Sequence, residues 1–116
     1  MQTVQIAFRD SGYAAALGGA LARSGQWRVE RVEAPDAGEN CVLVMDEESL
    51  SRVRQPLPNP ERVVLITRKN PKPESISNAW NAGITSLVST GDSVSTVLLA
   101  VMAAGLRLPH PDALPR

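Results

Sequence analysis

The chain has 116 residues, with 12 basic and 12 acidic side chains, one cysteine and one histidine. A chain of this length forms one domain, and it can fold without disulfides or a structural metal. Balanced charge argues against a domain whose main role is to neutralise nucleic-acid phosphates. Cys41 has no second cysteine to pair with, and together with His110 it cannot supply the ligands of a structural zinc site.

Signals for export or membrane insertion are absent from the sequence. The longest apolar stretch, 94–108, contains Arg107 and is shorter than the roughly 20 residues that span a bilayer. The first residues have no basic region followed by an apolar one, so no signal peptide is predicted. We therefore expect a cytoplasmic protein that does not associate with membranes.

In the first half of the chain, short apolar runs alternate with amphipathic segments. Residues 4–8 predict a buried strand, and Ser11 is placed to N-cap a helix over 12–24. The segment 27–32 alternates apolar and charged residues, which predicts a strand at the edge of a sheet. The run 41–45 is the most apolar of the chain, and it predicts a central strand covered by helices on both faces.

The second half begins with a short helix predicted over 49–54, which ends in a proline-rich stretch. Another buried strand is predicted at 63–66. It is followed by a helix over 74–82 with Gly83 at its C-terminal end. The residues of this helix that we expect to face the core are Ile76, Ala79 and Trp80.

The chain closes with a fifth strand and a long helix. A short strand is predicted at 86–88, and the helix ends at Gly105. The apolar residues of this helix recur at helical spacing: Val94, Val97, Leu98, Val101 and Met102. Residues 1–108 are therefore predicted to form the domain, and the proline-rich segment 109–116 is predicted to be a linker or a disordered tail.

The connection between the second and third predicted strands is unusually short. Eight residues separate Val32 from Cys41, whereas a helical crossover takes about a dozen or more. We therefore predict a doubly wound α/β sheet whose second helix is missing or reduced. A hairpin would also explain the short connection, but it would make the third strand antiparallel, which its two-sided apolar character disfavours.

Three segments carry a family resemblance: VVLIT at 63–67, AWNAGITSLV at 79–88 and VLLAVMAAGLRLP at 97–109. In order and spacing they resemble the receiver domain of two-component response regulators, in particular of regulators with LuxR/NarL-type helix-turn-helix output domains. The resemblance covers residues 4–109 and is stronger in the second half. It implies a flavodoxin-like (CheY-like) five-stranded parallel sheet of strand order 2-1-3-4-5.

The resemblance also implies a site. In that family, two acidic residues after the first strand and one aspartate after the third hold Mg²⁺, and the latter aspartate accepts a phosphoryl group. Asp46 stands at the phosphoacceptor position, Thr67 at the switch hydroxyl, and Asp10 at one of the two acidic positions. Arg9 replaces the other acid, and Ser89 replaces the lysine that follows the fifth strand.

These substitutions oppose the family's chemistry. Arg9 puts a fixed positive charge where a divalent cation would bind, Ser89 cannot neutralise a phosphate, and Ser86 replaces the switch aromatic. We therefore expect no efficient phosphorylation, and at most weak Mg²⁺ binding through Asp10 and Asp46. One hypothesis is that Arg9 forms an internal ion pair with Asp46. In another interpretation, Asp46 is simply the N-cap of the following helix.

Two classes of function remain. The resemblance implies a non-enzymatic signal-receiving and dimerisation module of a transcription regulator, which contacts DNA only through a separate output domain. Its expected partners are a second copy, bound through Leu99, Leu106 and Leu108 of the last helix, and a histidine kinase or a small-molecule ligand. The alternative is a flavodoxin-like small-ligand-binding or phosphocarrier domain. It is disfavoured because no cysteine follows the first strand and the sequence has no glycine-rich phosphate loop.

Overall fold

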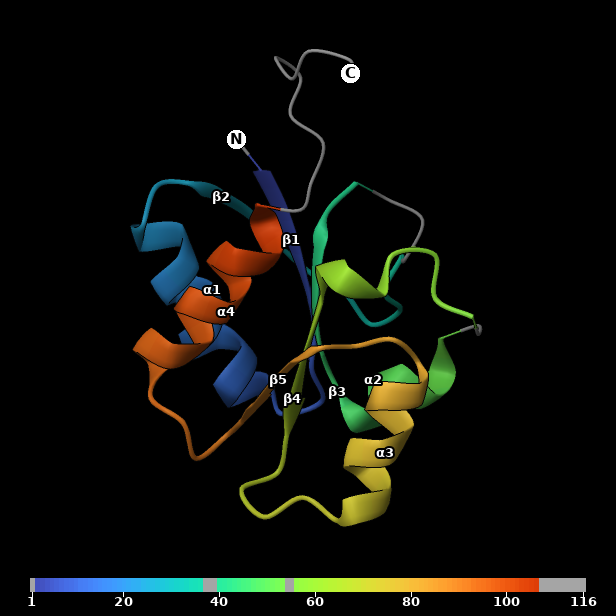
Figure 1. Ribbon diagram of the computed structural model, residues 1–116. Coiled ribbons are helices and arrows are strands. Elements are labelled where there is room, and N and C mark those ends of the chain that lie inside the picture. Colours follow the sequence, from blue (N-terminus) through green and yellow to red (C-terminus); the bar gives the residue numbers. More distant parts are fainter. Residues whose placement is uncertain (1, 37–39, 54–55, 107–116) are drawn as a thin grey trace.

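Five parallel strands form one sheet in the order β2-β1-β3-β4-β5 (Figure 1). The computed structural model describes residues 2–36, 40–53 and 56–106. The strands are β1 (Gln2–Ala7), β2 (Trp27–Arg31), β3 (Val42–Asp46), β4 (Val63–Thr67) and β5 (Ser86–Ser89). The predicted strand order is confirmed. Because β3 pairs in parallel with both β1 and β4, the hairpin alternative is wrong.

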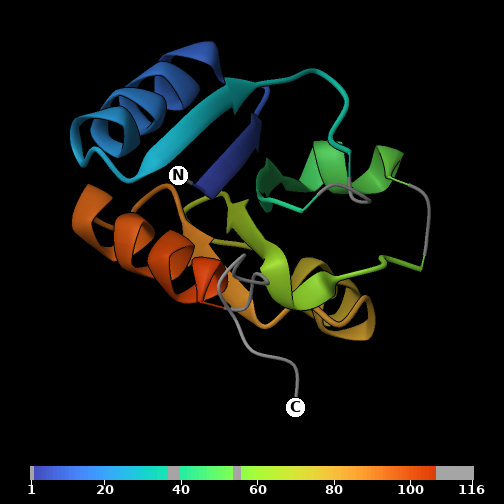
Figure 2. The same cartoon turned by 90° about the horizontal axis from the view of Figure 1, so that it is seen from above.

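Helices cover both faces of the sheet. They are α1 (Ser11–Arg23), α2 (Glu47–Arg52), α3 (Pro73–Asn81) and α4 (Val94–Gly105), with a 3₁₀ turn, η1 (Pro60–Arg62), before β4. Seen from above, α1 and α4 lie on one face, and α2 and α3 lie on the other (Figure 2). Within the described part of the chain, none of these helices is both long and apolar enough to cross a membrane.

The central position of β3 follows from its sequence. Val42 and Val44 belong to the core under α1 and α4, whereas Leu43 and Met45 belong to the core on the opposite face. All four side chains are buried. A strand with apolar residues at every position is stable only where both faces are covered, and β3 occupies the middle of the sheet.

The edge strand β2 is apolar on one face only. Trp27 is buried against the α1 and α4 core, and Arg28 is exposed. Gly105 at the end of α4 makes room for the indole, because a Cβ atom there would lie 2.6 Å from Cη2 of Trp27. Close packing of the last helix on the edge strand therefore requires glycine at position 105.

The described residues between β2 and β3, 32–36 and 40–41, contain no helix. On the sheet face that this connection crosses, β1 carries the polar side chain of Gln5, which is buried. Its Oε1 atom accepts a hydrogen bond from the Asp36 backbone N–H at 2.9 Å. The described part of the connection therefore gives this buried polar group a backbone hydrogen-bond partner without forming a helix.

The prediction for α3 was only partly correct. Ala79 is buried as expected, but the side chains of Ile76 and Trp80 are 43% and 71% exposed. The helix has nine residues and buries only the row that contains Ala79. Gly83, at a φ of 85°, then turns the chain toward β5. Ile76 and Trp80 are four residues apart on a neighbouring row of the helix, and this row faces solvent.

The last helix buries one stripe and exposes another. Val97, Val101 and Ala104 are buried, whereas Val94 and Met102 are each 46% exposed. Cys41 is a buried core residue that precedes β3. The predicted boundary after residue 108, the tail 109–116 and His110 lie outside the described residues.

Candidate functional site

The carboxyl ends of the strands form a cleft at one edge of the sheet. Strand register places Asp46 beside Ile66, and Thr67 beside Ser89. The cleft has a volume of about 430 Å³. Its lining residues are Phe8, Arg9, Asp10, Asp46, Glu47, Glu48, Ile66, Thr67, Arg68 and Thr90. Four of the five predicted site residues therefore line this cleft, namely Arg9, Asp10, Asp46 and Thr67. The fifth, Ser89, is not among the lining residues.

Asp46 is held by two backbone amides. Its Oδ2 atom accepts a hydrogen bond from the Arg9 N–H at 2.7 Å, and its Oδ1 atom accepts one from the Ser49 N–H at 2.8 Å. The second bond makes Asp46 the N-cap of α2, which begins at Glu47 instead of the predicted Ser49. The N-cap interpretation is therefore confirmed, and the same carboxylate also fixes the loop that follows β1.

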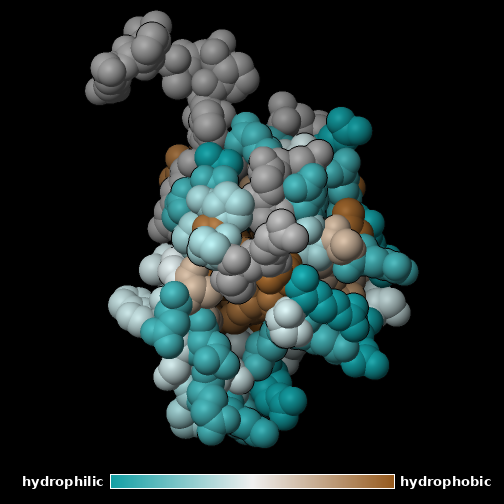
Figure 3. All heavy atoms as spheres, turned by 90° about the vertical axis from the view of Figure 1, so that its right-hand side faces the viewer, coloured by the Kyte–Doolittle hydropathy of each residue, from teal (hydrophilic) through white to brown (hydrophobic). Residues whose placement is uncertain are grey.

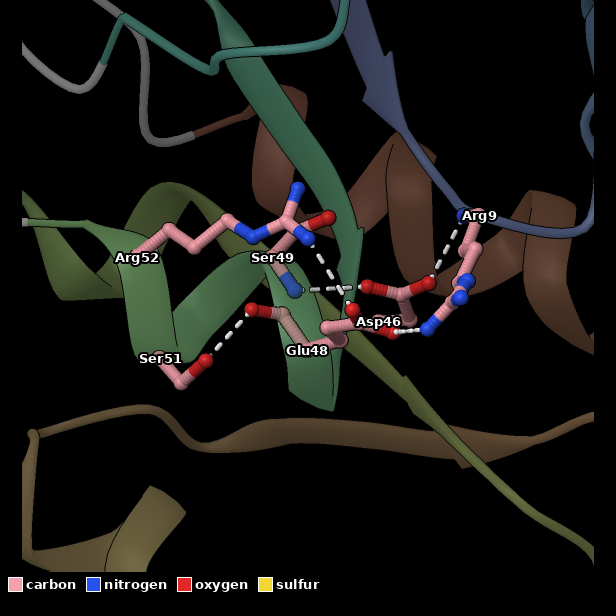
Figure 4. A network of polar contacts seen from close by, with 6 residues as sticks. All are labelled: Arg9, Asp46, Glu48, Ser49, Ser51 and Arg52. Carbon is pink, nitrogen blue, oxygen red and sulfur yellow. Dashed lines mark hydrogen bonds and ion pairs between the residues drawn. The ribbon is translucent and has the colours of Figure 1, made fainter.

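The Arg9 side chain pairs with a different carboxylate from the one we expected. Its Nη1 atom lies 2.6 Å from Oε2 of Glu48, and the other oxygen of Glu48 lies 3.0 Å from Nη2 of Arg52 (Figure 4). The hypothesis of an Arg9–Asp46 ion pair is thus wrong, because the guanidinium binds Glu48 and only the backbone N–H of Arg9 binds Asp46. The hydrogen bond to Glu48 and its negative charge raise the pKa of Arg9.

Two residues of this network, Glu48 and Arg52, were not predicted from the sequence. They are four residues apart on α2, which is the spacing of a glutamate–arginine pair on one helix face. The spacing alone could have predicted this ion pair from the sequence. Arg9 joins the pair from the loop after β1, so one glutamate connects two segments that are far apart in sequence.

Asp10 has a structural role in the described geometry. Its Oδ1 atom accepts a hydrogen bond from the Tyr13 N–H at 3.1 Å, so Asp10, and not Ser11, is the N-cap of α1. Next to it, the rings of Phe8 and Tyr13 are stacked with centroids 4.9 Å apart. Burial, and secondarily the charge of Asp92, raise the pKa of the Tyr13 hydroxyl.

The polar groups of β4 and β5 are bonded locally. Thr67 is buried, and its hydroxyl donates toward the carbonyl oxygens of Arg68 at 3.0 Å and Val88 at 3.4 Å. The Ser89 N–H donates to Oδ2 of Asp92 at 2.8 Å. These bonds direct the Thr67 hydroxyl toward backbone groups of its own part of the sheet and leave it without a bond to Asp46.

The residues of the cleft do not suit Mg²⁺. Hard divalent cations require several oxygen ligands, and the described residues contain no group of three acidic, histidine or cysteine side chains placed to hold a metal. Both oxygens of Asp46 and one oxygen of Asp10 accept backbone hydrogen bonds. The Arg9 guanidinium adds a positive charge to the wall of the cleft.

A larger cavity lies away from this cleft. It has a volume of about 620 Å³ and is situated between α2 and α3. The face that carries these two helices shows an apolar area in a hollow between hydrophilic side chains (Figure 3). The residues that line the cavity are Leu50, Ser51, Val53, Pro56, Asn78, Asn81 and Ala82. Among the residues that the structure describes, none that lines this cavity is titratable, whereas several charged side chains line the cleft at the strand ends.

Comparisons by sequence and by structure give different results. No protein-family model matches the chain, and no curated protein matches it. Solved structures do match. A response regulator from Thermotoga maritima has a TM-score of 0.69 at 19% identity, covering 91% of this chain and 98% of that one. The FixJ-N structure has a TM-score of 0.67 at 17% identity, covering 95% and 98%.

A third match comes from a protein with another description. A putative pilus assembly-related protein from Burkholderia pseudomallei has a TM-score of 0.65 at 18% identity, and the match covers 97% of this chain and 95% of that one. At these identities the likeness concerns the fold and does not transfer activity. Strand order, helix placement and these matches agree. The chain has the fold of response regulator receiver domains.

Proposed function

We propose that this chain is a receiver-like regulatory module that works without efficient phosphorylation of Asp46. One observation carries the proposal: both carboxylate oxygens of Asp46 accept backbone hydrogen bonds, from Arg9 and from Ser49. A phosphoryl acceptor must present a carboxylate oxygen to the donor. Here each oxygen already stabilises the backbone, and attack on a phosphoryl donor would compete with these bonds.

The surrounding charges support the same proposal. Phosphoryl transfer requires cations that neutralise the developing charge of the transition state. Of the cations that line the cleft, Arg9 lies in the loop whose N–H binds Asp46, and its guanidinium is bound to Glu48. At the position of the family's lysine, the Ser89 hydroxyl oxygen accepts a hydrogen bond from the Gly91 N–H. Neither group is placed to stabilise a phosphoryl group on Asp46.

We further propose that the module forms a homodimer through α4 and serves a transcription regulator whose DNA-binding domain is separate. α4 carries no charged residue. Leu99 and Leu106 are 65% and 81% exposed, as expected, and Met102 lies on the same side of the helix. They line an apolar groove of about 340 Å³ that includes Trp27. An uncharged apolar stripe can meet its own copy across a two-fold axis without charge repulsion. Leu108, the third predicted contact, lies outside the described residues.

Phosphorylation can be tested directly. The full chain is incubated with acetyl phosphate and Mg²⁺ and analysed by intact mass, with the Asp46→Asn variant as the matched control. We expect no adduct beyond that of the control. The double variant Arg9→Asp and Ser89→Lys restores the family's acid and lysine but keeps both backbone hydrogen bonds to Asp46, so we expect no adduct there either. An adduct that depends on Asp46 in this variant would show that the missing charges, and not these bonds, prevent phosphorylation. A stoichiometric adduct on the unaltered chain, absent from Asp46→Asn, would refute the proposal.

The dimer is tested by light scattering coupled to size exclusion. At tens of micromolar we expect the unaltered chain to show the mass of a dimer and the Leu99→Lys variant to show that of a monomer. Ile76→Lys is the control, because it places the same charge on an exposed apolar residue of α3. A monomeric unaltered chain, or equal dissociation by both variants, contradicts an interface on α4.

A further inference from the structure

The Arg9–Glu48 ion pair separates two cavities. The cleft at the strand ends has a volume of about 430 Å³, and a second cavity of about 440 Å³ lies beside it. The second cavity is lined by Phe8, Arg9, Val32, Glu33, Glu48, Ser49 and Arg52. Phe8, Arg9 and Glu48 line both cavities. The side chains that form the ion pair are therefore the partition between them.

Within the partition, one carboxylate is shared by two guanidinium groups. Each oxygen of Glu48 contacts one arginine, Arg9 at 2.6 Å and Arg52 at 3.0 Å (Figure 4). The side chains of Arg9, Arg52 and Glu48 are 77%, 65% and 38% exposed. Ion pairs this exposed contribute little to stability, so a carboxylate from solution can compete with Glu48 for both arginines.

We propose that the second cavity binds a small organic monocarboxylate, whose carboxyl group replaces that of Glu48 between Arg9 and Arg52. Arginine binds carboxylates in a planar, directional geometry, and two arginines converge at this point. The half-buried side chains of Phe8 and Val32 provide an apolar wall for the body of such a ligand. The other lining residues are polar or charged, so the arginines would fix the carboxyl group and the apolar wall would contact one side of the ligand.

The balance of charge selects a monoanion. The charged residues of the cavity are Arg9, Arg52, Glu33 and Glu48, whose formal charges sum to zero. Each further negative charge on a ligand is therefore repelled by the displaced Glu48 and by Glu33, and a dianion such as phosphate would also approach Asp46 and Glu47 in the neighbouring cleft. A monoanion meets the smaller repulsion.

Displacement of Glu48 would change a contact between two other parts of the fold. Glu48 belongs to α2, and Arg9 belongs to the loop after β1, whose N–H binds Asp46. Occupation of the cavity would therefore release the side-chain link between these two segments and leave the bonds of Asp46 in place. This inference does not depend on whether Asp46 accepts a phosphoryl group, so either proposal can fail without the other.

The test is a titration of the full chain with benzoate, followed by NMR of the arginine side chains and backbone amides at constant ionic strength. We expect saturable shifts at Phe8, Arg9 and Arg52. Glu48→Gln removes the internal competitor, and we expect it to strengthen benzoate binding about threefold or more. Arg52→Gln removes one of the two guanidiniums, so we expect binding to weaken several-fold.

The matched control is Glu47→Gln, which removes the same charge from the adjacent residue and leaves the bridge intact. We expect benzoate affinity to change less than in Glu48→Gln, and we expect no shifts with uncharged benzamide. The inference is overturned by an equal gain in both variants, by binding of inorganic phosphate as tight as that of benzoate, or by an absence of saturable shifts in the unaltered chain. Arg52→Gln gives an independent test if Glu48→Gln does not fold.

Discussion

The two halves of the strand-end edge organise their polar groups differently. In the half formed by β1, β3 and α2, Asp46 and Glu48 connect segments that are distant in sequence, through the loop after β1. In the half formed by β4 and β5, Thr67 bonds to backbone carbonyls, and Ser89 bonds to Asp92 three residues away. In the first half, carboxylates connect distant segments. In the second half, polar groups form hydrogen bonds within β4, β5 and their loops.

The two halves also contain the two residues that depart from the resemblance, Arg9 and Ser89, and the contacts of these residues differ. The guanidinium of Arg9 binds Glu48 and connects the loop after β1 to α2. The hydroxyl of Ser89 accepts a hydrogen bond from the Gly91 N–H within a turn. The charged side chain therefore connects distant segments, whereas the small hydroxyl is bonded within its own loop.

The largest effect on the free energy of unfolding is expected from removing Asp46, which connects the loop after β1 to α2. Asp46→Ala deletes the N-cap of α2 and the acceptor for the Arg9 N–H, and we expect it to lower the free energy of unfolding by about 2 kcal/mol. Asp10→Ala deletes a cap with one hydrogen bond, and we expect a loss of about 1 kcal/mol. Urea denaturation measures both values. If Asp46→Ala lowers the free energy of unfolding no more than Asp10→Ala does, the bond to the Arg9 N–H does not contribute to stability. The contrast between the two halves is then wrong.

A smaller effect is expected in the local half. Thr67→Val keeps the shape of a buried side chain and removes its hydroxyl, and we expect a loss of about 1 kcal/mol in the free energy of unfolding. Because the hydroxyl bonds only to backbone of β4 and β5 and their loops, NMR signals of Arg9 and Arg52 should remain in place. Movement of those signals would show that the two halves are coupled.

The smallest effect concerns an electrostatic contact between α1 and the loop after β5. Burial and the charge of Asp92 raise the pKa of Tyr13 above its ordinary value of 10.0. Asp92→Asn should lower this pKa only in part, because burial is the larger cause. Ultraviolet titration of the phenolate measures the change. An unchanged pKa would show that the charge of Asp92 does not act on Tyr13.

The sign of the pH dependence follows from the direction of the shift. A raised pKa means that the folded protein favours the protonated phenol more than the unfolded chain does. The resulting stability is complete below the unfolded pKa, near 10, and it is lost as the pH rises through the folded value. We therefore expect the contribution of Tyr13 to disappear in strongly alkaline solution and to be insensitive to acid.

The sequence was sufficient where burial determines position. The run 41–45 is apolar at every residue and predicted the central strand, and the alternating pattern of 27–32 predicted the edge strand. It was insufficient for Ile76 and Trp80, because apolar spacing shows which residues share a helix face and does not show whether a short helix turns that face to the core.

By itself, the sequence determined the alternation of strands and helices and the reduced β2–β3 connection, because burial of apolar runs is a one-dimensional property. Its resemblance to receiver domains supplied the strand order and the set of residues at the strand ends, since parallel strands bring their carboxyl ends to one edge. Only the tertiary structure decided which of these groups bind one another. Asp46 accepts two backbone N–H bonds, and the Arg9 guanidinium binds Glu48, because the choice among several nearby donors and carboxylates depends on geometry over a few ångströms.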